Sequence, residues 1–395
     1  MKFNIHHLAA ALLLSAIHCQ LSTALAQGSL TPPPGAPAPT MKTLDQIEAR
    51  MPISSAPFTI TVPGSYYLTT NLTVSAGDAI TIAASGVTLD LSGFTIASTD
   101  PSTTGTGILL NSGLRNLAIL NGFIQGGVTN NGGVYTGSGF GSGIFGFPQT
   151  LRVSGVSVSG CLYLGIYLGN GDSTVVESCI VRTVGGDGIV AATIKSSVAK
   201  DCGGSAIYGF QVADCRGEST GGGIGLSATT ALNCCGFSSS GDGLDATAAQ
   251  NCYGLSSSFG SGLYAETAQN CKGSSSSGTG LYANTANNCQ GASSSGTGLQ
   301  AYTAYNCIGQ SNGSGSGVYA DYVAVGCYGS SVSGYGVRGD LVNNCYGKST
   351  SNTGVSAPRI AIGSYGTSTS GTGLMTIMAN SCSGSTISVF FPYDM

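Results

Sequence analysis

Histidine and tryptophan are almost missing from this chain of 395 residues. It has no tryptophan, and its three histidines, His6, His7 and His18, all lie near its beginning. Once that segment is removed, no histidine is left for Ser-His-Asp or Cys-His catalysis or for ligating a metal ion. Charged residues make up only 8% of the chain and the net charge is −4, so no basic patch indicates a nucleic-acid partner.

Long hydrophobic runs are also scarce. The apolar stretch of residues 8–17 follows Lys2 and precedes an Ala-Leu-Ala motif at residues 24–26. This order is typical of a secretory signal peptide, which we expect over residues 1–26. We therefore expect export, to the periplasm or out of the cell, and no later segment is apolar enough for a membrane span.

The chain is rich instead in glycine, with 63 residues, and in one short repeat. A single anchor position recurs, mostly every 18 to 20 residues, and is occupied by Phe94, Phe123, Val156, Cys179, Cys202, Cys215, Cys234, Cys252, Cys271, Cys289, Cys307, Cys327, Cys345, Ser364 and Cys382. The residue before the anchor is Gly, Asn, Asp or Ser, and the residue three positions before it is apolar. Gly, Asn and Asp tolerate a left-handed backbone and Ser is common in turns, so each unit turns a corner between two inward positions.

A second column pairs Gly with an aliphatic residue, from Ile144 to Leu374, and is often followed two residues later by Ala. Units this short cannot bury their apolar side alone and must stack on their neighbours. Three short strands per unit, without helical periodicity, predict an all-β fold. We expect a single-stranded parallel β-helix (solenoid) of about 15 coils over residues 55–385.

The ends of the chain differ from the repeat. Residues 27–40 form a Pro-rich linker, and residues 41–54 are expected to hold a short capping helix with Leu44, Ile47 and Met51 at helical spacing. Residues 386–395 are expected to be a C-terminal cap, because they are more apolar than the late units. The Gly-, Asn- and Thr-rich residues 125–143 predict a long loop extruded between coils.

Thirteen cysteines lie beyond the signal peptide, which in an exported chain normally suggests disulfides. Here cysteine replaces Phe and Val at one inward position and behaves as a small buried apolar residue, so we expect mostly free thiols. Disulfides between adjacent coils are the alternative. A metal-binding thiol ladder is disfavoured because no Cys-x-x-Cys motif is present, and no metal site is expected. Cys161 and Cys235 lie off the column, and Cys235 should face outward.

A family resemblance is carried by residues 64–68, 80–82, 86–94 and 116–123, which include Gly-Ser-Tyr-Tyr-Leu and Gly-Val-Thr-Leu-Asp-Leu-Ser-Gly-Phe. Together with the Pro-rich leader they resemble the opening coils of secreted bacterial parallel β-helix proteins of the pectin-lyase-like, NosD-type class. The resemblance covers residues 30–190 and implies a right-handed solenoid. It also implies that polysaccharide is held on the first strand face, and relatives include pectate lyases and polygalacturonases.

Charged side chains cluster in a few coils and suggest one candidate site. Asp201 and Asp214 fall in what reads as the same corner column on consecutive coils, with Lys200 and Arg216 beside them. Two carboxylates about 5 Å apart would suit Ca²⁺ or an acid/base pair. The plainer interpretation is that both are corner residues balanced by neighbouring cations. No cofactor is expected apart from this Ca²⁺ candidate.

Outward-facing tyrosines suggest a second site. The candidates for glycan contact share one strand column: Tyr167, Tyr208, Tyr264, Tyr282 and Tyr319. Tyr253, Tyr328, Tyr346 and Tyr365 share another. Flat aromatic faces can stack on sugar rings, although tyrosine also favours exposed strand positions for its own sake. We therefore expect a non-catalytic, secreted protein that binds polysaccharide or plays a structural or adhesive role at the cell surface. The alternative is a polysaccharide lyase or glycoside hydrolase.

Overall fold

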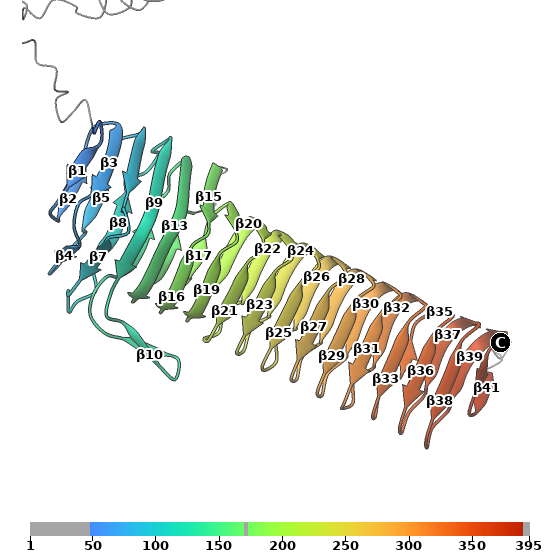
Figure 1. Ribbon diagram of the computed structural model, residues 1–395. Helices are drawn as coiled ribbons and strands as arrows, with labels where there is room; N and C mark the ends of the chain where they lie inside the picture. Colours follow the sequence, from blue (N-terminus) through green and yellow to red (C-terminus); the bar gives the residue numbers. More distant parts are fainter. Residues whose placement is uncertain (1–47, 170–172, 390–395) are drawn as a thin grey trace, which may run out of the picture. The chain divides into compact units, whose positions relative to one another are not determined.

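A single β-sheet wraps around itself to form the body of the protein. The computed structural model describes residues 48–169 and 173–389. From Arg50 onward these residues form a parallel β-solenoid of about 17 turns (Figure 1). Its 39 strands make one continuous sheet, and no helix occurs among the described residues. The predicted all-β solenoid is confirmed, with two turns more than the expected 15.

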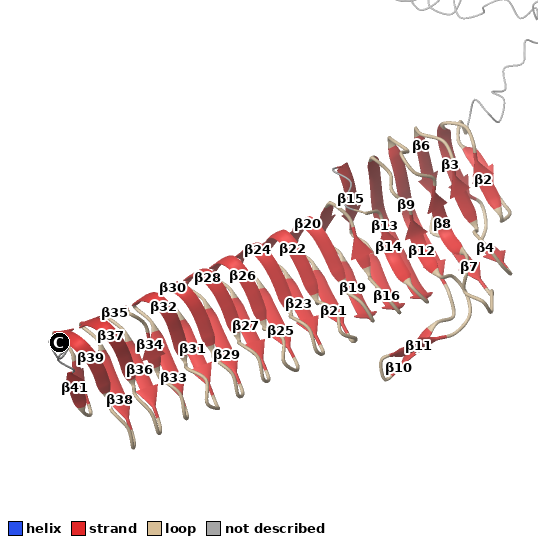
Figure 2. Cartoon of the chain, turned by 180° about the vertical axis from the view of Figure 1, so that it is seen from behind, coloured by secondary structure: helices blue, strands red, loops and turns tan. Residues whose placement is uncertain are grey.

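The sheet has three faces, and each turn passes through face 1, face 2 and face 3 in that order (Figure 2). In the first turns each face usually has its own strand. Face 1 holds β2 (Phe58–Ile60), β5 (Ile80–Ile82), β8 (Thr106–Leu110), β12 (Ser142–Phe145), β14 (Leu164–Tyr167) and β17 (Ile189–Val190). Face 2 holds β1 (Met51–Ile53), β3 (Gly64–Leu68), β6 (Val87–Asp90), β15 (Ser173–Glu177) and β18 (Thr193–Lys195).

Later turns join faces 1 and 2 in one longer strand. These strands are β20 (Ile207–Ala213), β22 (Leu226–Leu232), β24 (Leu244–Gln250), β26 (Leu263–Gln269), β28 (Leu281–Asn287), β30 (Leu299–Tyr305), β32 (Val318–Val325), β37 (Val355–Ile362) and β39 (Leu374–Asn380). One late turn keeps them apart, as β34 (Val337–Arg338) and β35 (Leu341–Asn343), and β41 (Ile387–Val389) ends face 1.

Face 3 is made of shorter strands. They are β4 (Leu72–Val74), β7 (Thr95–Ser98), β16 (Ile180–Val184), β19 (Val198–Cys202), β21 (Arg216–Ser219), β23 (Cys235–Ser238), β25 (Tyr253–Ser256), β27 (Lys272–Ser275), β29 (Gln290–Ser293), β31 (Ile308–Ser311), β33 (Tyr328–Ser331), β36 (Tyr346–Ser349), β38 (Tyr365–Ser368) and β40 (Ser383–Gly384). In two early turns β9 (Leu117–Gln125) and β13 (Thr150–Cys161) run through both face 2 and face 3.

The burial pattern of one strand explains the corner between faces 1 and 2. In β26 Leu263, Ala265 and Ala268 are buried, whereas Glu266 and Thr267 are exposed in succession. Two consecutive outward residues break the alternation of a flat strand, so the chain bends between them. Three strand segments per turn were predicted, and this bend is where two of them join.

The corner between faces 2 and 3 follows the predicted left-handed residues. Asn251, Asn270 and Asn288 have φ values of 53°, 53° and 52°, and the same corner holds Asn233, Asn306 and Asn344. The Nδ2 of Asn251 donates to Oδ1 of Asn233 at 3.2 Å, and that of Asn270 to Asn251 at 3.3 Å. Stacked amides therefore satisfy one another from turn to turn.

Inside that corner lies the cysteine column. From Cys215 to Cys345 every turn places one buried cysteine here, and each cysteine of the described residues is a free thiol. The Sγ of Cys271 donates to the carbonyl of Gln269 at 3.2 Å and lies 3.4 Å from that of Ala249 in the preceding turn. This arrangement agrees with the predicted free thiols. Cys235 lies outside the column and is half-buried, as predicted.

Two positions assigned to this column were wrong. Cys202 pairs with Val184 in the register of face 3, and Ser197 takes the column position between Cys179 and Cys215. The interval from Cys202 to Cys215 is much shorter than the other intervals, and this change of spacing indicates that Cys202 lies outside the column. Phe123 is 49% exposed, because Gly122 occupies the inward position next to Val156.

A second buried row runs along face 3 and is made of serine. From Ser219 to Ser349 every turn places one buried serine there. Ser275 Oγ donates to the carbonyl of Gly260 at 2.7 Å and accepts from the N–H of Gly278 at 2.9 Å. Most of these hydroxyls therefore tie one turn of the chain to the previous one.

The outer segments differ from the expectations. The first half of the helix expected over residues 41–54 lies outside the described residues, and its second half contains a strand, β1, which pairs with β3. The solenoid thus begins before residue 55. At the other end β41 pairs with β39 and continues the stack into the segment expected to be a cap, while residues 390–395 lie outside the described part. The segments expected to be a signal peptide (residues 1–26) and a linker (residues 27–40) also lie outside it.

The predicted loop of residues 125–143 contains a hairpin of its own. Strands β10 (Thr129–Asn131) and β11 (Val134–Thr136) pair antiparallel and leave the stack between β9 and β12 (Figure 2). The hairpin lies against later turns, because a Cβ added to Gly203 would come within 3.0 Å of the Tyr135 ring.

Candidate functional site

An aromatic column runs along the outside of face 1. The register aligns Phe145 with Tyr167, Tyr167 with Val190 and Val190 with Tyr208. Farther along, it aligns Tyr264 with Tyr282 and, two turns on, with Tyr319. All five tyrosines expected to share one column therefore do so.

The rings of this column lie parallel where two tyrosines are direct neighbours. Tyr264 and Tyr282 have ring centroids 5.0 Å apart and an angle of 3° between the rings. Tyr264 is 42% exposed. The stacked pair therefore presents part of its aromatic surface to solvent.

A slot opens where a short residue separates two tyrosines. Tyr167 and Tyr208 stand two turns apart, about 10 Å by strand spacing, with Val190 between them. A cavity of about 210 Å³ lies there, lined also by Asp187 and Ser205. The Oδ1 of Asp187 accepts the N–H of Ser205 at 2.8 Å. The slot thus combines aromatic walls with a carboxylate and a hydroxyl.

The C-terminal part of the column has a basic neighbour. Gln300 separates Tyr282 from Tyr319, and Arg338 follows Tyr319 in the register. The Arg338 guanidinium lies 5.3 Å from the ring centroid of Tyr319, a cation–π contact.

A second aromatic column lies on face 3, as predicted. Tyr328, Tyr346 and Tyr365 follow one another in the register, with ring centroids 5.3 Å and 5.4 Å apart. Tyr253 belongs to the same column and contacts Phe237 edge to face at 5.7 Å. The two columns are on different faces, so each can be altered without the other.

The expected pairing of Asp201 with Asp214 is wrong. Asp214 shares its corner column with Asn233, whose Nδ2 donates to Oδ1 of Asp214 at 3.1 Å. Asp201 belongs to the far end of face 3, in the turn before, and follows Lys200, which pairs with Arg182. The shift that moved Cys202 off its column also moved Asp201, because they are adjacent residues.

The Asp201 carboxylate is bound instead by the hairpin and by Thr220 of the next turn. Asn130 Nδ2 donates to it at 2.5 Å, Tyr135 Oη at 3.0 Å and Thr220 Oγ1 at 3.2 Å. Burial acts to raise the pKa of Asp201, but the hydrogen bonds outweigh it and hold the pKa below its ordinary value of 3.8. Asn130 and Tyr135 were missed by sequence reasoning, because no local pattern brings them to Asp201.

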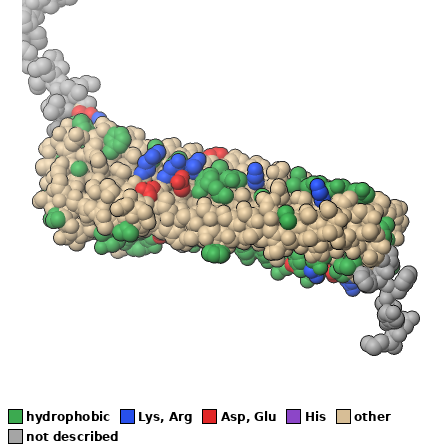
Figure 3. Space-filling model, turned by 90° about the horizontal axis from the view of Figure 1, so that it is seen from below, with side chains coloured by type: hydrophobic (Ala, Val, Ile, Leu, Met, Phe, Trp, Pro, Cys, Tyr) green, Lys and Arg blue, Asp and Glu red, His purple; other side chains and the backbone are tan. Residues whose placement is uncertain are grey.

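Lys200 and Arg216, the other candidate residues, lie on face 3 with Glu218. Lys200 Nζ is 3.8 Å and Arg216 Nη2 3.5 Å from the Glu218 carboxylate, and Arg216 also lies 4.4 Å over the Phe237 ring. Figure 3 shows such a gathering of basic and acidic side chains beside hydrophobic ones on the visible face. These cations therefore neutralise Glu218, not an Asp pair. In the described part of the chain no three His, Cys, Asp or Glu side chains gather to hold a metal ion.

Comparison with known proteins shows little. No model of a known protein family matches the chain, and no curated protein is significantly similar to it in sequence. Among solved structures, the crystal structure of the Dettilon tailspike protein (gp208) is similar over 85% of this chain, with 12% identity and a TM-score of 0.26. The chain spans 61% of the length of that protein. Within the described residues no helix is long and apolar enough to cross a membrane.

Proposed function

We propose that this is an exported, non-catalytic β-helix protein that binds polysaccharide along face 1 and so serves an adhesive or structural role at the cell surface. The tyrosines at positions 167, 208, 264, 282 and 319 form the contact surface. In the described part of the chain, large aliphatic side chains fill the interior of the early turns, and small residues and backbone fill that of the later turns. Binding therefore has to use the outside of the solenoid.

The observation that supports this proposal is the slot between Tyr167 and Tyr208. The rings stand about 10 Å apart, so a flat ring inserted between them can contact both through its C–H faces. A saccharide unit has such faces and also carries hydroxyls, which Asp187 and Ser205 can bind at the rim of the cavity. Further tyrosines in the same column extend the surface along a chain of sugars.

The geometry does not favour the lyase or hydrolase alternative with the residues first considered for it. Asp201 is hydrogen-bonded to the hairpin and Asp214 to Asn233, on different edges of face 3. A pair of carboxylates flanking one bond is the requirement of glycoside hydrolysis, and these two do not flank one.

Binding is tested by electrophoresis through gels containing neutral or acidic polysaccharides. Replacing Tyr264 and Tyr282 by Ala removes one stacked pair, at roughly 1 kcal/mol per ring, so we expect about 30-fold weaker binding. The matched control replaces Tyr328 and Tyr346, the equally stacked pair on face 3, and should migrate as the unaltered protein does. Equal retardation of both double variants, or no retardation of the unaltered protein by any polysaccharide, contradicts the proposal.

A further inference from the structure

The outside of face 2 changes character near its C-terminal end. One outward column carries Thr267, Thr285 and Thr303 on successive turns. In the next four turns it carries aliphatic residues: Val323, Leu341, Ile360 and Met378. Threonine at this outward position is compatible with the same core, so the change to aliphatic side chains, of which Met378 is exposed and the other three are half-buried, marks a surface with a separate role.

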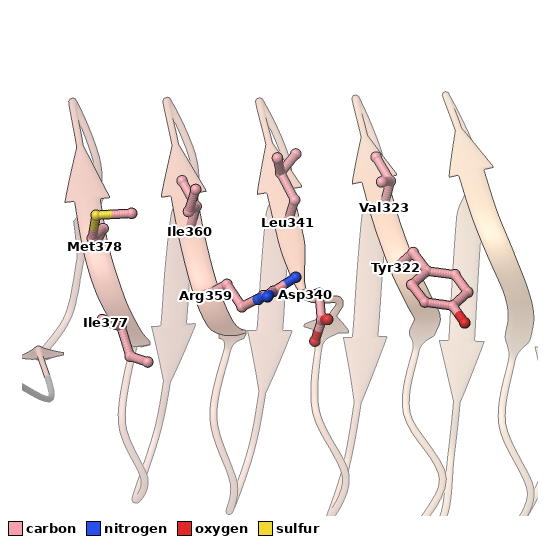
Figure 4. Close-up of a pocket in the computed structure, with 8 residues that line it drawn as sticks. All are labelled: Tyr322, Val323, Asp340, Leu341, Arg359, Ile360, Ile377 and Met378. Atoms are coloured by element: carbon pink, nitrogen blue, oxygen red, sulfur yellow. The ribbon is translucent and has the colours of Figure 1, made fainter. Parts of the chain in front are cut away.

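A second row lies directly beside this column. Its members each precede an aliphatic residue of the column: Tyr322, Asp340, Arg359 and Ile377. The two rows line a groove of about 550 Å³, drawn in Figure 4. Tyr322 is 60% and Met378 55% exposed. We call these eight residues the face 2 patch.

The two charges of the patch, Asp340 and Arg359, lie at its centre, and the Arg359 side chain extends toward Asp340 (Figure 4). The carbonyl of Asp340 accepts the N–H groups of Arg359 and Ile360 at 3.3 Å and 3.1 Å, which places the two residues on adjacent turns. Yet among the ion pairs of the described residues neither the Asp340 carboxylate nor the Arg359 guanidinium takes part. An acid and a base that form no ion pair among the described residues leave both charges available to a partner.

The order of residues in both rows is self-complementary. Along the solenoid one row reads aromatic, acid, base, aliphatic, and the other is aliphatic throughout. A two-fold axis that runs parallel to the strands, between Leu341 and Ile360, reverses this order in a second copy. Asp340 then faces Arg359 of the other copy, and Arg359 faces its Asp340, so both charges are paired at once. The same operation sets Leu341 against Ile360, and Tyr322 against Ile377.

We propose that two copies of this protein associate through the face 2 patch, side by side and antiparallel, as an isologous dimer. This arrangement buries the aliphatic column and forms two ion pairs across the axis. The patch extends over four turns, about 14 Å from the first to the last. It is smaller than the roughly 800 Å² per partner of a stable interface, so we expect a weak dimer, with a Kd between about 1 μM and 1 mM.

The dimer leaves face 1 free, because the patch and the tyrosines of the polysaccharide surface lie on different faces. Two solenoids joined in this way present two polysaccharide surfaces, but the association itself does not depend on polysaccharide binding. The dimer can therefore be tested on the purified protein alone.

Sedimentation velocity over a range of concentrations tests the proposal by charge exchange. Asp340→Arg places two arginines of one copy opposite two of the other, and Arg359→Asp does the same with two aspartates. We expect each variant to dimerise at least tenfold more weakly than the unaltered protein. A mixture of the two variants should associate, because every Arg then faces an Asp, and the double exchange Asp340→Arg with Arg359→Asp should restore self-association.

The mixing result separates pairing across the axis from a general effect on folding, and circular dichroism of each variant checks the fold. Thr267→Arg, on the column of Val323 and Leu341 but three turns before Val323, is the control and should dimerise normally. If the unaltered protein remains monomeric up to about 1 mM, the proposal is overturned. Single variants that dimerise as tightly as the unaltered protein overturn it as well.

Discussion

At the scale of single residues, the interior is thin enough for backbone to contact backbone. A Cβ placed on Gly254 in β25 would lie 2.0 Å from the carbonyl oxygen of Gly262, in the loop that leads to face 1. The corresponding glycines of neighbouring turns, Gly236 and Gly273, are equally close to Gly243 and Gly280. Glycine is therefore required in this row because of space, and the repeat keeps it in every turn.

Gly254→Ala should destabilise the protein by about 3 kcal/mol, since no flexible side chain can move away from the added methyl. Chemical denaturation measures the change. Gly222→Ala is the control, because nothing lies within 4 Å of a Cβ added there. Its free energy of unfolding should change by less than about 0.5 kcal/mol. Two variants of equal stability would show that the turns can separate enough to admit a methyl group.

At the scale of elements, the β10–β11 hairpin connects turns that are distant in sequence. Tyr135 Oη lies 2.6 Å from Thr220 Oγ1 and binds Asp201, so a segment between the third and fourth turns reaches several turns farther on. Burial is the main cause of the raised pKa of Tyr135. Neutral donors of the hairpin therefore bind the Asp201 carboxylate, and the Tyr135 ring covers Gly203.

Asp201→Ala should release the hairpin, because it removes an acceptor shared by Asn130, Tyr135 and Thr220. Hydrogen bonds to a charged group contribute about 1.5–3 kcal/mol, so amide exchange within residues 129–136 should become at least tenfold faster. Asp214→Ala, which affects a carboxylate that accepts from Asn233 and not from the hairpin, is the control and should leave that exchange unchanged. Unaltered exchange in Asp201→Ala would show that ring packing alone holds the hairpin.

The contribution of Asp201 to the stability of the docked hairpin depends on pH. Because folding lowers the pKa of Asp201 below its ordinary 3.8, the stability that it contributes is fully present above pH 3.8. It is lost only as the pH falls through the lowered value of the folded protein. Hairpin exchange should therefore stay slow at pH 5 and rise under strongly acidic conditions.

At the scale of the whole molecule, the buried thiols make the free energy of unfolding depend on pH in the alkaline range. Burial raises the pKa of Cys215 to about 12, that of Cys161 to about 12 and that of Cys179 to about 11, from an ordinary value of 9.0. For Cys252 and Cys307 the hydrogen bonds with neighbouring thiols, and then burial, raise the pKa further. In Cys234, Cys271 and Cys327, by contrast, hydrogen bonds with neighbouring thiols lower the pKa. Only the thiols with a raised pKa therefore make the folded protein less stable at alkaline pH.

The free energy of unfolding should fall as the pH rises above about 9. Thiols of the unfolded chain then lose their protons, whereas Cys179 and Cys215 keep theirs up to pH 11 or 12 in the folded protein. Each such thiol lowers stability by up to about 1.4 kcal/mol per pH unit in this range. Urea denaturation at several pH values between 7 and 11 measures the slope.

Serine already stands in this column at Ser197 and Ser364, so Cys179→Ser with Cys215→Ser is a matched variant that cannot ionise there. It should have a shallower slope than the unaltered protein. A stability independent of pH up to 11 would contradict free buried thiols and would favour disulfides between turns.

Most of the fold follows from the repeat, because a fixed period makes residues of one column neighbours in space wherever the period holds. The asparagine corner, the thiol column and both tyrosine columns were predicted on this basis. The prediction was wrong where the spacing changed, at Cys202 and at Phe123. A change of spacing does not say on which side of the corner the extra residues are accommodated, and the pairing of Asp201 with Asp214 was wrong for the same reason.

Periodic composition alone thus specified a stacked, thin-walled β-solenoid and the residues on its outside, since stacking turns a pattern along the chain into a pattern in space. The hairpin over Asp201, the slot beside Tyr167 and the meeting of Asp340 with Arg359 at the centre of an apolar patch required the folded chain. Each depends on contacts between segments of different spacing or on the depth of a surface. None of these three features can be recognised in a local stretch of the sequence, because each forms only when particular turns lie side by side.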